Sequence, residues 1–341
     1  MERRIQLADA LRRAAPELAA AITDEFLARH PDWRERYGER AYTAGVEDAI
    51  FHIRFLAGAI EAGAPSAFAD YARWTGRVLS ARGIATTFLH ENLRQVEEAL
   101  ASRVSEDNRR IAARYIDAAL EALAAPGDAA ESPPGVTSRL YVQALLGGER
   151  RAALQIAREA LATGTSLIEL YIDVFQSALY EVGRLWEANR ITVAQEHMAT
   201  AITQYVMAQT YQPAERRASP RGRLLMSGVE GELHSVGAVM VSDVLETCGW
   251  EVRFVGTDLP RASILAAIRE EQPTHLGLSV TMVFNVPAVR LLLQEVRQQF
   301  GSAIHVLVGG AAFRAAGELW REVGADGFAP DLRSAQQLLC A

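Results

Sequence analysis

From Arg223 onward, short β-rich runs alternate with helical stretches, and this alternation constrains the fold more than any other feature of the sequence. The runs are RLLMSGV, EVRFVGTD, HLGLSVTM and AIHVLVGG, and the stretches between them include Ala238–Cys248, Arg261–Glu271 and Pro287–Phe300. Strands that alternate with helices form a parallel sheet, because each helix returns the chain across one face. We therefore predict a doubly wound α/β domain, Rossmann-like or flavodoxin-like, over 222–341.

Upstream of this region the sequence has helical periodicity only. Residues 1–125 contain several segments with apolar residues three and four positions apart. These segments are Ile5 to Ala21, Ala41 to Glu61, Ala67 to Ser80 and Thr86 to Ala101. The same periodicity returns over 138–212, where turn residues separate four segments, as in a four-helix bundle. The sequence thus predicts an all-α domain at 1–125, a bundle at 138–212 and the α/β domain, with linkers at 124–138 and 212–223.

Composition excludes several classes of protein. Half of the 341 residues are apolar, which allows each predicted domain a core of its own. The net charge of -7 disfavours binding to nucleic acid or to an anionic membrane surface. No segment approaches the ~20 apolar residues of a membrane span, and the charged start does not resemble a signal peptide, so we expect a cytoplasmic protein. Cys248 and Cys340 are the two cysteines, and we predict neither a disulfide nor a cysteine metal site.

The turns after the predicted strands carry a spaced set of polar and small residues. The set is Glu232, His234, Gly237, Ser279, Thr281, Gly309 and Gly310. A doubly wound sheet binds ligands at the carboxyl ends of its strands, where these turns lie. A single loop histidine is more often a bystander than a ligand, and a Gly-Gly pair alone is consistent with a simple turn. The spacing carries more information, with 41 residues between Gly237 and Ser279 and 27 between Thr281 and Gly309.

This pattern resembles the cobalamin-binding domain of methionine synthase, the carbon-skeleton mutases and the methyltransferase corrinoid proteins. Their pattern is Asp-x-His-x-x-Gly, Ser-x-Leu or Ser-x-Thr, then Gly-Gly, and the resemblance covers 223–341. It implies that His234 displaces the nucleotide base of cobalamin and ligates cobalt from below. Glu232 stands where the family has Asp, and a carboxylate that accepts the other ring N–H fixes the histidine tautomer. Ser279 and Thr281 with Gly309 and Gly310 would line the slot for the displaced nucleotide tail.

The stretch RLWEANRITVAQEHMAT lies in the predicted bundle. Trp186 is followed by nine residues and then by Glu196 and His197. Taken alone, these residues are consistent with a core aromatic and a helix-face pair. The spacing resembles the Trp-x9-Glu-His signature of light-sensing adenosylcobalamin photoreceptors, which implies that all three residues contact the adenosyl group. Glu187 stands where the photoreceptor repressors have a histidine, so His197 or water would have to occupy the upper cobalt position after photolysis.

The arrangement of all three domains resembles the photocobilins, in which cobalamin is paired with the linear tetrapyrrole biliverdin. The resemblance implies a globin-like sensor domain at 1–125, and the absence of cysteine from 1–247 implies that biliverdin binds non-covalently. Candidate contacts are His52, Tyr71, Trp74 and His90 for the rings, and Arg73 and Arg77 for the propionates. The alternatives are an ordinary helical core with a solvated arginine face, or His90 as a haem ligand.

The predicted function is a light-sensing signalling protein without catalysis of its own. It would bind adenosylcobalamin and biliverdin, and photolysis would change domain packing, the homo-oligomeric state and binding to an unknown downstream partner. One alternative is a corrinoid methyl carrier of a methyltransferase system, which the Trp-x9-Glu-His spacing and the long first domain disfavour. A second alternative is the cobalamin subunit of a radical mutase, which would need a substrate barrel of ~250 residues that the sequence does not encode.

Overall fold

The computed structural model describes residues 1–101, 103–125, 133–211, 221–314 and 316–340. Its chain contacts divide it into two compact units. The first unit contains residues 1–126 together with Met282–Arg290 and Ala311–Val323, and the second contains the remainder. Residues 126–132 of the first predicted linker and 212–220 of the second lie outside the described residues, so the linkers and the three-domain division remain predictions.

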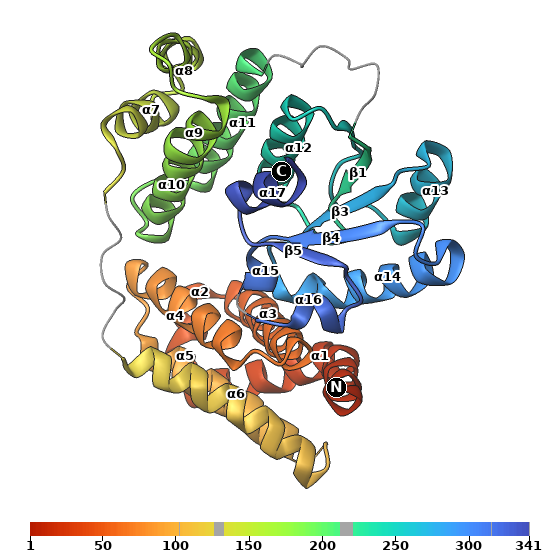
Figure 1. The fold of residues 1–341 in the computed structure, drawn as a ribbon. Helices are drawn as coiled ribbons and strands as arrows, with labels where there is room; N and C mark the ends of the chain where they lie inside the picture. Colours follow the sequence, from red (N-terminus) through yellow and green to blue (C-terminus); the bar gives the residue numbers. More distant parts are fainter. Residues whose placement is uncertain (102, 126–132, 212–220, 315, 341) are drawn as a thin grey trace. The chain divides into compact units, whose positions relative to one another are not determined.

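The N-terminal part of the first unit is helical, as predicted. Its helices are α1 (Glu2–Arg29), α2 (Pro31–Tyr37), α3 (Arg40–Ala62), α4 (Pro65–Ala81), α5 (Thr86–Ala101) and α6 (Glu106–Ala124) (Figure 1). Pro31 and Pro65 occupy first helical positions, where the missing N–H costs nothing. Apolar faces of α1, α3, α4, α5 and α6 share one core, so the periodicity of the sequence is explained by burial in this unit.

Two segments from the last third of the chain complete the first unit. They are the 3-10 turn η2 (Val283–Asn285) with the start of α14 (Val286–Phe300), and the short helices α15 (Ala311–Arg314) and α16 (Leu319–Glu322).

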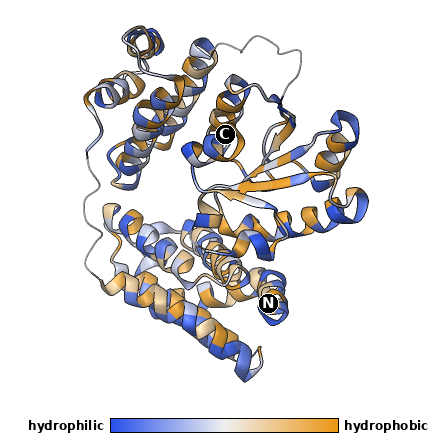
Figure 2. Ribbon diagram, viewed as in Figure 1, coloured by the Kyte–Doolittle hydropathy of each residue, from blue (hydrophilic) through white to orange (hydrophobic). Residues whose placement is uncertain are grey.

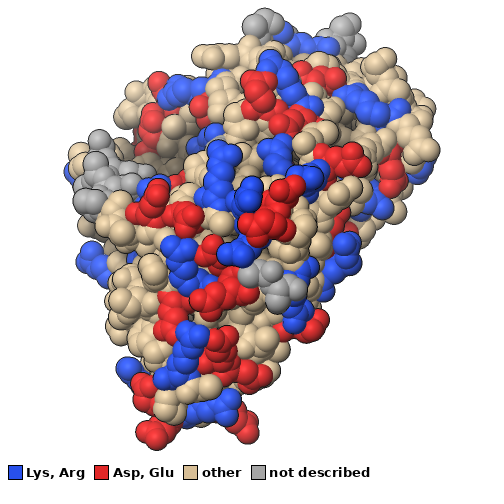
Figure 3. Space-filling view, turned by 90° about the horizontal axis from the view of Figure 1, so that it is seen from below, with Lys and Arg blue, Asp and Glu red and all other residues tan. Residues whose placement is uncertain are grey.

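On the face of the molecule shown in Figure 3, arginines and carboxylates are interspersed, and neither sign of charge forms a separate patch.

The second unit begins with a helical block. Its members are α7 (Val136–Leu146), α8 (Arg150–Ala162), α9 (Leu167–Glu169), the π-helical segment η1 (Leu170–Gln176), α10 (Ser177–Glu187) and α11 (Val193–Thr210). Capping boxes at Ser166 and Thr192 begin α9 and α11, because each hydroxyl accepts a hydrogen bond from the backbone N–H three residues later. α9, η1 and α10 follow one another without a break, so this block consists of four helical rods.

A five-stranded parallel sheet forms the centre of the α/β domain, which confirms the predicted fold class. The strands are β1 (Arg223–Ser227), β2 (Glu251–Phe254), β3 (His275–Ser279), β4 (His305–Gly309) and β5 (Gly327–Ala329), in the order β2-β1-β3-β4-β5. Sequence analysis did not identify β5. Right-handed crossovers place α12 (Val236–Thr247) on one face, with α17 (Leu332–Cys340) beside it, and α13 (Arg261–Glu271) and α14 on the other (Figure 1). Figure 2 shows that the strands are largely apolar.

The helical block packs against α12 and α17 within the second unit. Met240 and Val244 of α12 and Leu332 of α17 belong to the same apolar core as the block. Two phenols cross this contact: the hydroxyl of Tyr171 donates to Asp243 at 2.6 Å, and that of Tyr211 donates to Glu246. Apolar burial and these hydrogen bonds together fix the block on this face of the sheet.

Cys248 and Cys340 form a disulfide with a Cα–Cα separation of 5.6 Å, so the prediction that they stay unpaired is wrong. The two cysteines are 92 residues apart in the sequence, but α17 packs against α12 and brings its last residues to the end of α12. The indole N–H of Trp250 donates to the carbonyl of Leu339 at 2.9 Å and strengthens the same contact. Among the described residues, no helix is both long and apolar enough to cross a membrane.

Candidate functional site

The histidine turn joins β1 to α12 at the carboxyl edge of the sheet. Val229 still bridges to Leu259 after β1 has ended, and Gly231 then turns the chain with a positive φ of 84°. The backbone N–H of Gly231 donates to Oδ1 of Asp258 at 2.8 Å, which fixes the turn against the loop after β2. These contacts hold Glu232 and His234 directly before the first residue of α12.

Glu232 is a buried carboxylate with three donors around it. Its Oε1 lies 2.5 Å from Nδ1 of His234 and accepts the backbone N–H of His234 at 3.1 Å. Its Oε2 accepts the backbone N–H of Thr281 at 2.7 Å. Burial raises the pKa of Glu232, but the hydrogen bonds from His234 and Thr281 outweigh this effect and hold the pKa below its ordinary value. Glu232 is therefore an ionised acceptor, although its side chain is 0% exposed.

This arrangement leaves the imidazole of His234 suited to bind a metal. Because Nδ1 donates to Glu232, the neutral ring keeps its lone pair on Nε2. The side chain is 50% exposed, so a ligand can reach the ring. An imidazole whose second nitrogen is held by a carboxylate is a common ligand arrangement for transition metals, and it fits cobalt. The extra methylene of Glu232, relative to Asp, is compatible with this geometry.

The other motif residues gather at the same edge of the sheet. Ser279 pairs in register with Gly309 across β3 and β4, and Thr281 lies two residues after Ser279. Gly310 has a φ of 98°, and a Cβ there would lie 2.2 Å from the carbonyl oxygen of Val280. Packing against Val280 therefore requires glycine at position 310, independently of the predicted contact with a nucleotide tail.

Gly237 has no such packing reason. A Cβ at this position in the first turn of α12 would meet nothing within 4 Å. The fold of the described residues therefore tolerates a side chain there. A glycine at this position, three residues from His234, fits the close approach of a bound ligand.

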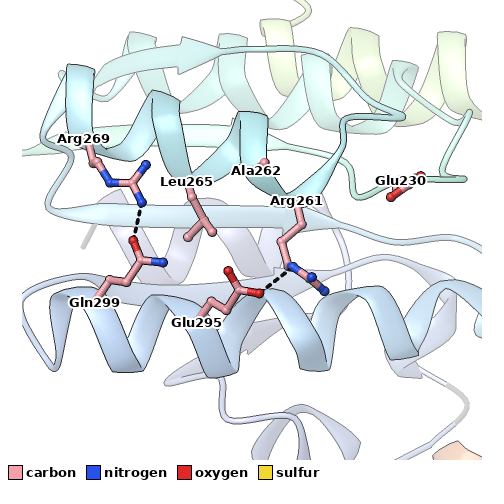
Figure 4. Close-up of a pocket in the computed structure, with 7 residues that line it drawn as sticks. All are labelled: Glu230, Arg261, Ala262, Leu265, Arg269, Glu295 and Gln299. Carbon is pink, nitrogen blue, oxygen red and sulfur yellow. Dashed lines mark hydrogen bonds and ion pairs between the residues drawn. The ribbon is translucent and has the colours of Figure 1, made fainter.

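A separate cavity of about 410 Å³ lies between α13 and α14 and contains none of the motif residues (Figure 4). Its lining is Glu230, Arg261, Ala262, Leu265, Arg269, Glu295 and Gln299. Arg261 pairs with Glu295 at 2.7 Å, and Arg269 donates to Gln299, so both guanidinium groups are already engaged. Among the described residues, no group of three or more His, Cys, Asp or Glu side chains is arranged to hold a metal.

The predicted cap residues lie at consecutive helix ends. Trp186 is in the last turn of α10, Glu196 is in the first turn of α11, and His197 follows it. Nδ1 of His197 lies 2.6 Å from Oε2 of Glu196, and the His197 side chain is 76% exposed. α11 reaches the histidine turn where Nε2 of Gln204 donates to Oγ of Ser235 at 3.3 Å. Contact of these residues with an upper cobalt ligand stays a prediction.

The predicted biliverdin contacts divide into two groups. His52 and Tyr71 are buried and share a 2.7 Å hydrogen bond, and the Trp74 ring centroid lies 6.2 Å from that of Tyr71. Burial lowers the pKa of His52 to about 4, so the ring is neutral. Arg73 pairs with Asp70, and Arg77 and His90 are exposed. The first group therefore forms a satisfied core, and the structure does not bring His90 to it.

Sequence analysis missed one functional position and one role. Asp258 fixes the histidine turn, and its place after the second predicted strand was the signal that could have identified it. Thr281 was predicted to line the nucleotide slot, but its backbone N–H on Glu232 was not foreseen, because a residue pattern does not reveal backbone contacts.

Comparison with known proteins identifies the helical block and the α/β domain. Residues 138–210 and 222–335 each match a family model described as a B12 binding domain. The chain is 29% identical to dimethylamine corrinoid protein 1 of Methanosarcina acetivorans over 47% of this chain and 75% of the relative. It is also 29% identical to dimethylamine corrinoid protein 3 of Methanosarcina mazei, over 46% of this chain and 93% of the relative.

Two further matches have lower identity. Trimethylamine corrinoid protein 1 of Methanosarcina acetivorans is 25% identical over 48% of this chain and 77% of its own length. The solved structure of the monomethylamine corrinoid protein of Methanosarcina barkeri is 20% identical, has a TM-score of 0.49, and covers 59% of this chain and 95% of its own.

These findings contradict the predicted light-sensing function. The curated relatives are named dimethylamine and trimethylamine corrinoid proteins, which matches the alternative of a corrinoid methyl carrier. The prediction of a photoreceptor depended on the Trp-x9-Glu-His spacing. The structure places Trp186, Glu196 and His197 near adjacent helix ends, and this placement does not specify an upper ligand.

The cofactor prediction is confirmed only at its coarser level. The matched domains support a cobalamin-type cofactor, whereas the adenosyl form and biliverdin have no support. The two B12-binding models leave residues 1–137 unmatched, so the helical first domain keeps no assigned ligand. Residues 138–210 and 222–335 are B12-binding domains, and the chain is a cobalamin-binding protein.

Proposed function

We propose that the chain is a corrinoid methyl carrier of a methyltransferase system and that a separate methyltransferase catalyses the transfer steps. The observation that carries the proposal is the Glu232–His234 pair, a buried carboxylate on Nδ1 of a half-exposed imidazole. It lies inside a B12-binding domain whose curated relatives are named methylamine corrinoid proteins. A corrinoid bound here would supply a cobalt atom that accepts a methyl group from a methylated donor and releases it to a nucleophile.

The residues of the chain would hold this cofactor from one side. His234 would offer Nε2 to the cobalt, and Glu232 would fix the tautomer and orientation of the ring. Gly237 would allow the corrinoid to approach the start of α12, because no protein atom lies within 4 Å of its missing side chain. Ser279 and Thr281, with Gly309, would face the displaced nucleotide at the ends of β3 and β4.

The helical block would cover the opposite side of the cofactor. Glu196 and His197 form a pair at the exposed start of α11, and α11 is tied to Ser235 beside the ligand histidine. A carrier must expose its methyl group in turn to a donor and an acceptor protein, so its cap must release the upper side of the cofactor in at least one state. The partner we propose is accordingly a methyltransferase.

The test uses full-length protein loaded in the dark with a corrinoid that bears an isotopically labelled methyl group. The loaded protein is mixed with purified methyltransferases for methylated amines and thiols, and mass spectrometry follows the label into the thiol. We expect transfer with the wild type and, because His234→Ala removes the proposed ligand itself, a loss in that variant at least as large as the roughly 10- to 100-fold caused by outer-shell changes. His305→Ala, at the start of β4 and 49% exposed, is the matched control and should transfer normally.

A parallel measurement compares binding of methylcobalamin and adenosylcobalamin by equilibrium dialysis. Retention of the label on the wild type with every methyltransferase, together with preferential binding of the adenosyl form, would contradict the proposal. An absorption spectrum that shows the nucleotide base still on the metal would contradict the assigned role of His234.

A further inference from the structure

Two segments of the α/β sequence pack within the helical first unit, and each follows a motif residue directly. Met282–Arg290 begins one peptide bond after Thr281, and Ala311–Val323 begins one peptide bond after Gly310. Nothing in the B12-binding matches accounts for the first domain. The contacts that hold Met282–Arg290 within this unit therefore indicate what the domain does.

Helix α3 touches η2 backbone to backbone. A Cβ on Gly58 would lie 2.8 Å from Cα of Phe284 and 3.0 Å from the carbonyl carbon of Val283. Any side chain at this position must push η2 away from α3, because the atoms it meets are main-chain atoms and cannot rotate aside. Gly58 thus sets the distance between the helix and the turn.

Aromatic and cationic side chains close around Phe284. The ring of Phe55 meets that of Phe284 edge to face at 5.0 Å, and the guanidinium of Arg54 lies 4.6 Å above the same ring. Phe55 also stacks on Tyr71 at 3.8 Å, and Tyr71 shares its hydroxyl with His52. Continuous packing therefore runs from the buried His52–Tyr71 pair to the turn after β3.

A buried carboxylate fixes the other end of the segment. The Glu61 side chain is only 3% exposed and lies between two arginines. Its Oε2 is 2.5 Å from Arg12 of α1, and its Oε1 is 2.8 Å from Arg290 near the start of α14. A buried charge that loses one partner is strongly disfavoured, so this bridge holds the start of α14 against α3.

We propose that α3 positions the lower ligand of the corrinoid by fixing the segment that follows Thr281. With η2 and the start of α14 held by Gly58 and Glu61, the backbone N–H of Thr281 stays on Oε2 of Glu232. Glu232 in turn orients the imidazole of His234. This inference rests on the proposed role of His234 as the cobalt ligand and gives the first domain a part in it.

The coupling works in both directions. A ligand or partner that shifts α3 would weaken the hold of Glu232 on His234, and ligation of cobalt would stabilise the packing of η2 on α3, because coupling free energies are reciprocal. Glu61 pairs with Arg12 and Arg290, and Gly58 meets the backbone of Val283 and Phe284, so these residues act on the motif through Thr281 and are positioning residues.

The test uses full-length protein loaded with Co(II) cobalamin. Electron paramagnetic resonance reports whether a nitrogen lies on the lower side of the metal, and equilibrium dialysis with hydroxocobalamin gives the dissociation constant. Both Gly58→Ala and Arg290→Gln should raise this dissociation constant about 5-fold, which is less than the 10- to 100-fold typical of outer-shell changes. Both should also lower the fraction of bound cobalamin that has a histidine nitrogen on the cobalt. Arg290→Lys, which keeps the charge, should recover part of the loss.

Matched controls separate this role from general damage to the fold. Gly183→Ala changes a helix glycine whose Cβ would meet nothing within 4 Å, and Arg103→Gln removes an exposed arginine 3.1 Å from Glu17. Both should bind and ligate like the wild type. If Gly58→Ala does not fold, the result for Arg290→Gln tests the proposal, because Glu61 keeps its ion pair with Arg12 in Arg290→Gln.

The outcomes distinguish this inference from the proposed function. A wild-type signal without the histidine nitrogen overturns the assigned ligand and this inference together. A wild-type signal with the histidine nitrogen, unchanged in Arg290→Gln, overturns the positioning role of α3 and leaves the methyl-carrier proposal intact. Ligation that falls in Arg290→Gln and recovers in Arg290→Lys supports the positioning role.

Discussion

Oε2 of Glu232 accepts the backbone N–H of Thr281 at 2.7 Å, so a residue in the loop after β1 is fixed to the chain just after β3. The same carboxylate holds Nδ1 of His234 with its other oxygen. Because Glu232 is fully buried, it has little freedom to choose other partners. The two neighbouring strands β1 and β3 thus jointly determine the direction of the imidazole.

Replacement of Glu232 by glutamine should weaken corrinoid binding about 10- to 100-fold. The amide keeps one acceptor oxygen, but its NH2 group would face either the N–H of Thr281 or Nδ1–H of His234, which places two donors together. Equilibrium dialysis with hydroxocobalamin measures the effect. Glu230→Gln, two residues away and exposed, is the control, and equal affinities of the two variants would rule out the proposed role of the carboxylate.

Two glycine substitutions should distinguish a glycine that the fold requires from one that ligand contact requires. Gly310→Ala should destabilise the α/β domain by about 2 kcal/mol or more, because φ is 98° and the new Cβ would overlap the carbonyl of Val280. Gly237→Ala should leave the thermal unfolding temperature unchanged but reduce corrinoid affinity, because only a ligand would meet its Cβ. Unchanged affinity in a folded Gly237→Ala variant would show that the corrinoid does not approach this turn.

The pH dependence of stability should change in Asp243→Asn. Burial raises the pKa of Asp243 to about 6, above its ordinary value of 3.8, so the native state binds this proton more tightly than the unfolded state. The stabilising contribution is complete below about pH 4 and is lost as the pH rises through 6. Asparagine still accepts the hydrogen bond from Tyr171, but it has no proton to lose as the pH rises. At pH 7 the free energy of unfolding of the variant should therefore exceed that of the wild type by on the order of 1 kcal/mol, a value reduced for partial exposure.

Urea unfolding of the wild type and Asp243→Asn between pH 4.5 and 7.5 measures this difference. Asp173→Asn, an exposed carboxylate in η1 two residues from Tyr171, is the control and should follow the wild type. Parallel stability curves for the wild type and Asp243→Asn would show that the Tyr171–Asp243 pair does not titrate in this range.

Reduction of the Cys248–Cys340 disulfide should destabilise the α/β domain by about 2 to 4 kcal/mol, because the bond closes a long loop in the unfolded chain. Dithiothreitol should lower the unfolding temperature of the wild type and leave that of the Cys248→Ser/Cys340→Ser double variant unchanged. Two thiols that react with a labelling reagent in oxidised, unfolded protein would show that the bond does not form.

The resemblance to photoreceptors, which goes beyond the cobalamin motif from Glu232 to Gly310, led to a wrong prediction of function. The spacing from Glu232 to Gly310 correctly predicted cobalamin binding, because each of its elements follows a strand and all of them meet at one edge of the sheet. Trp186, Glu196 and His197 define only two helix ends, and such a spacing is compatible with more than one upper ligand. The function drawn from it was accordingly contradicted by the relatives.

The sequence alone determined the parallel α/β fold, the helical regions before it and the residues of the motif. These features follow from local periodicity and from the turn after each strand, which depend on neighbours a few residues away. Tertiary structure decided the burial of Glu232 against Thr281, the bond between Cys248 and Cys340 and the packing of Gly58 on Phe284. Each of these pairs lies tens to hundreds of residues apart, and only the packing of whole helices and strands brings its members together.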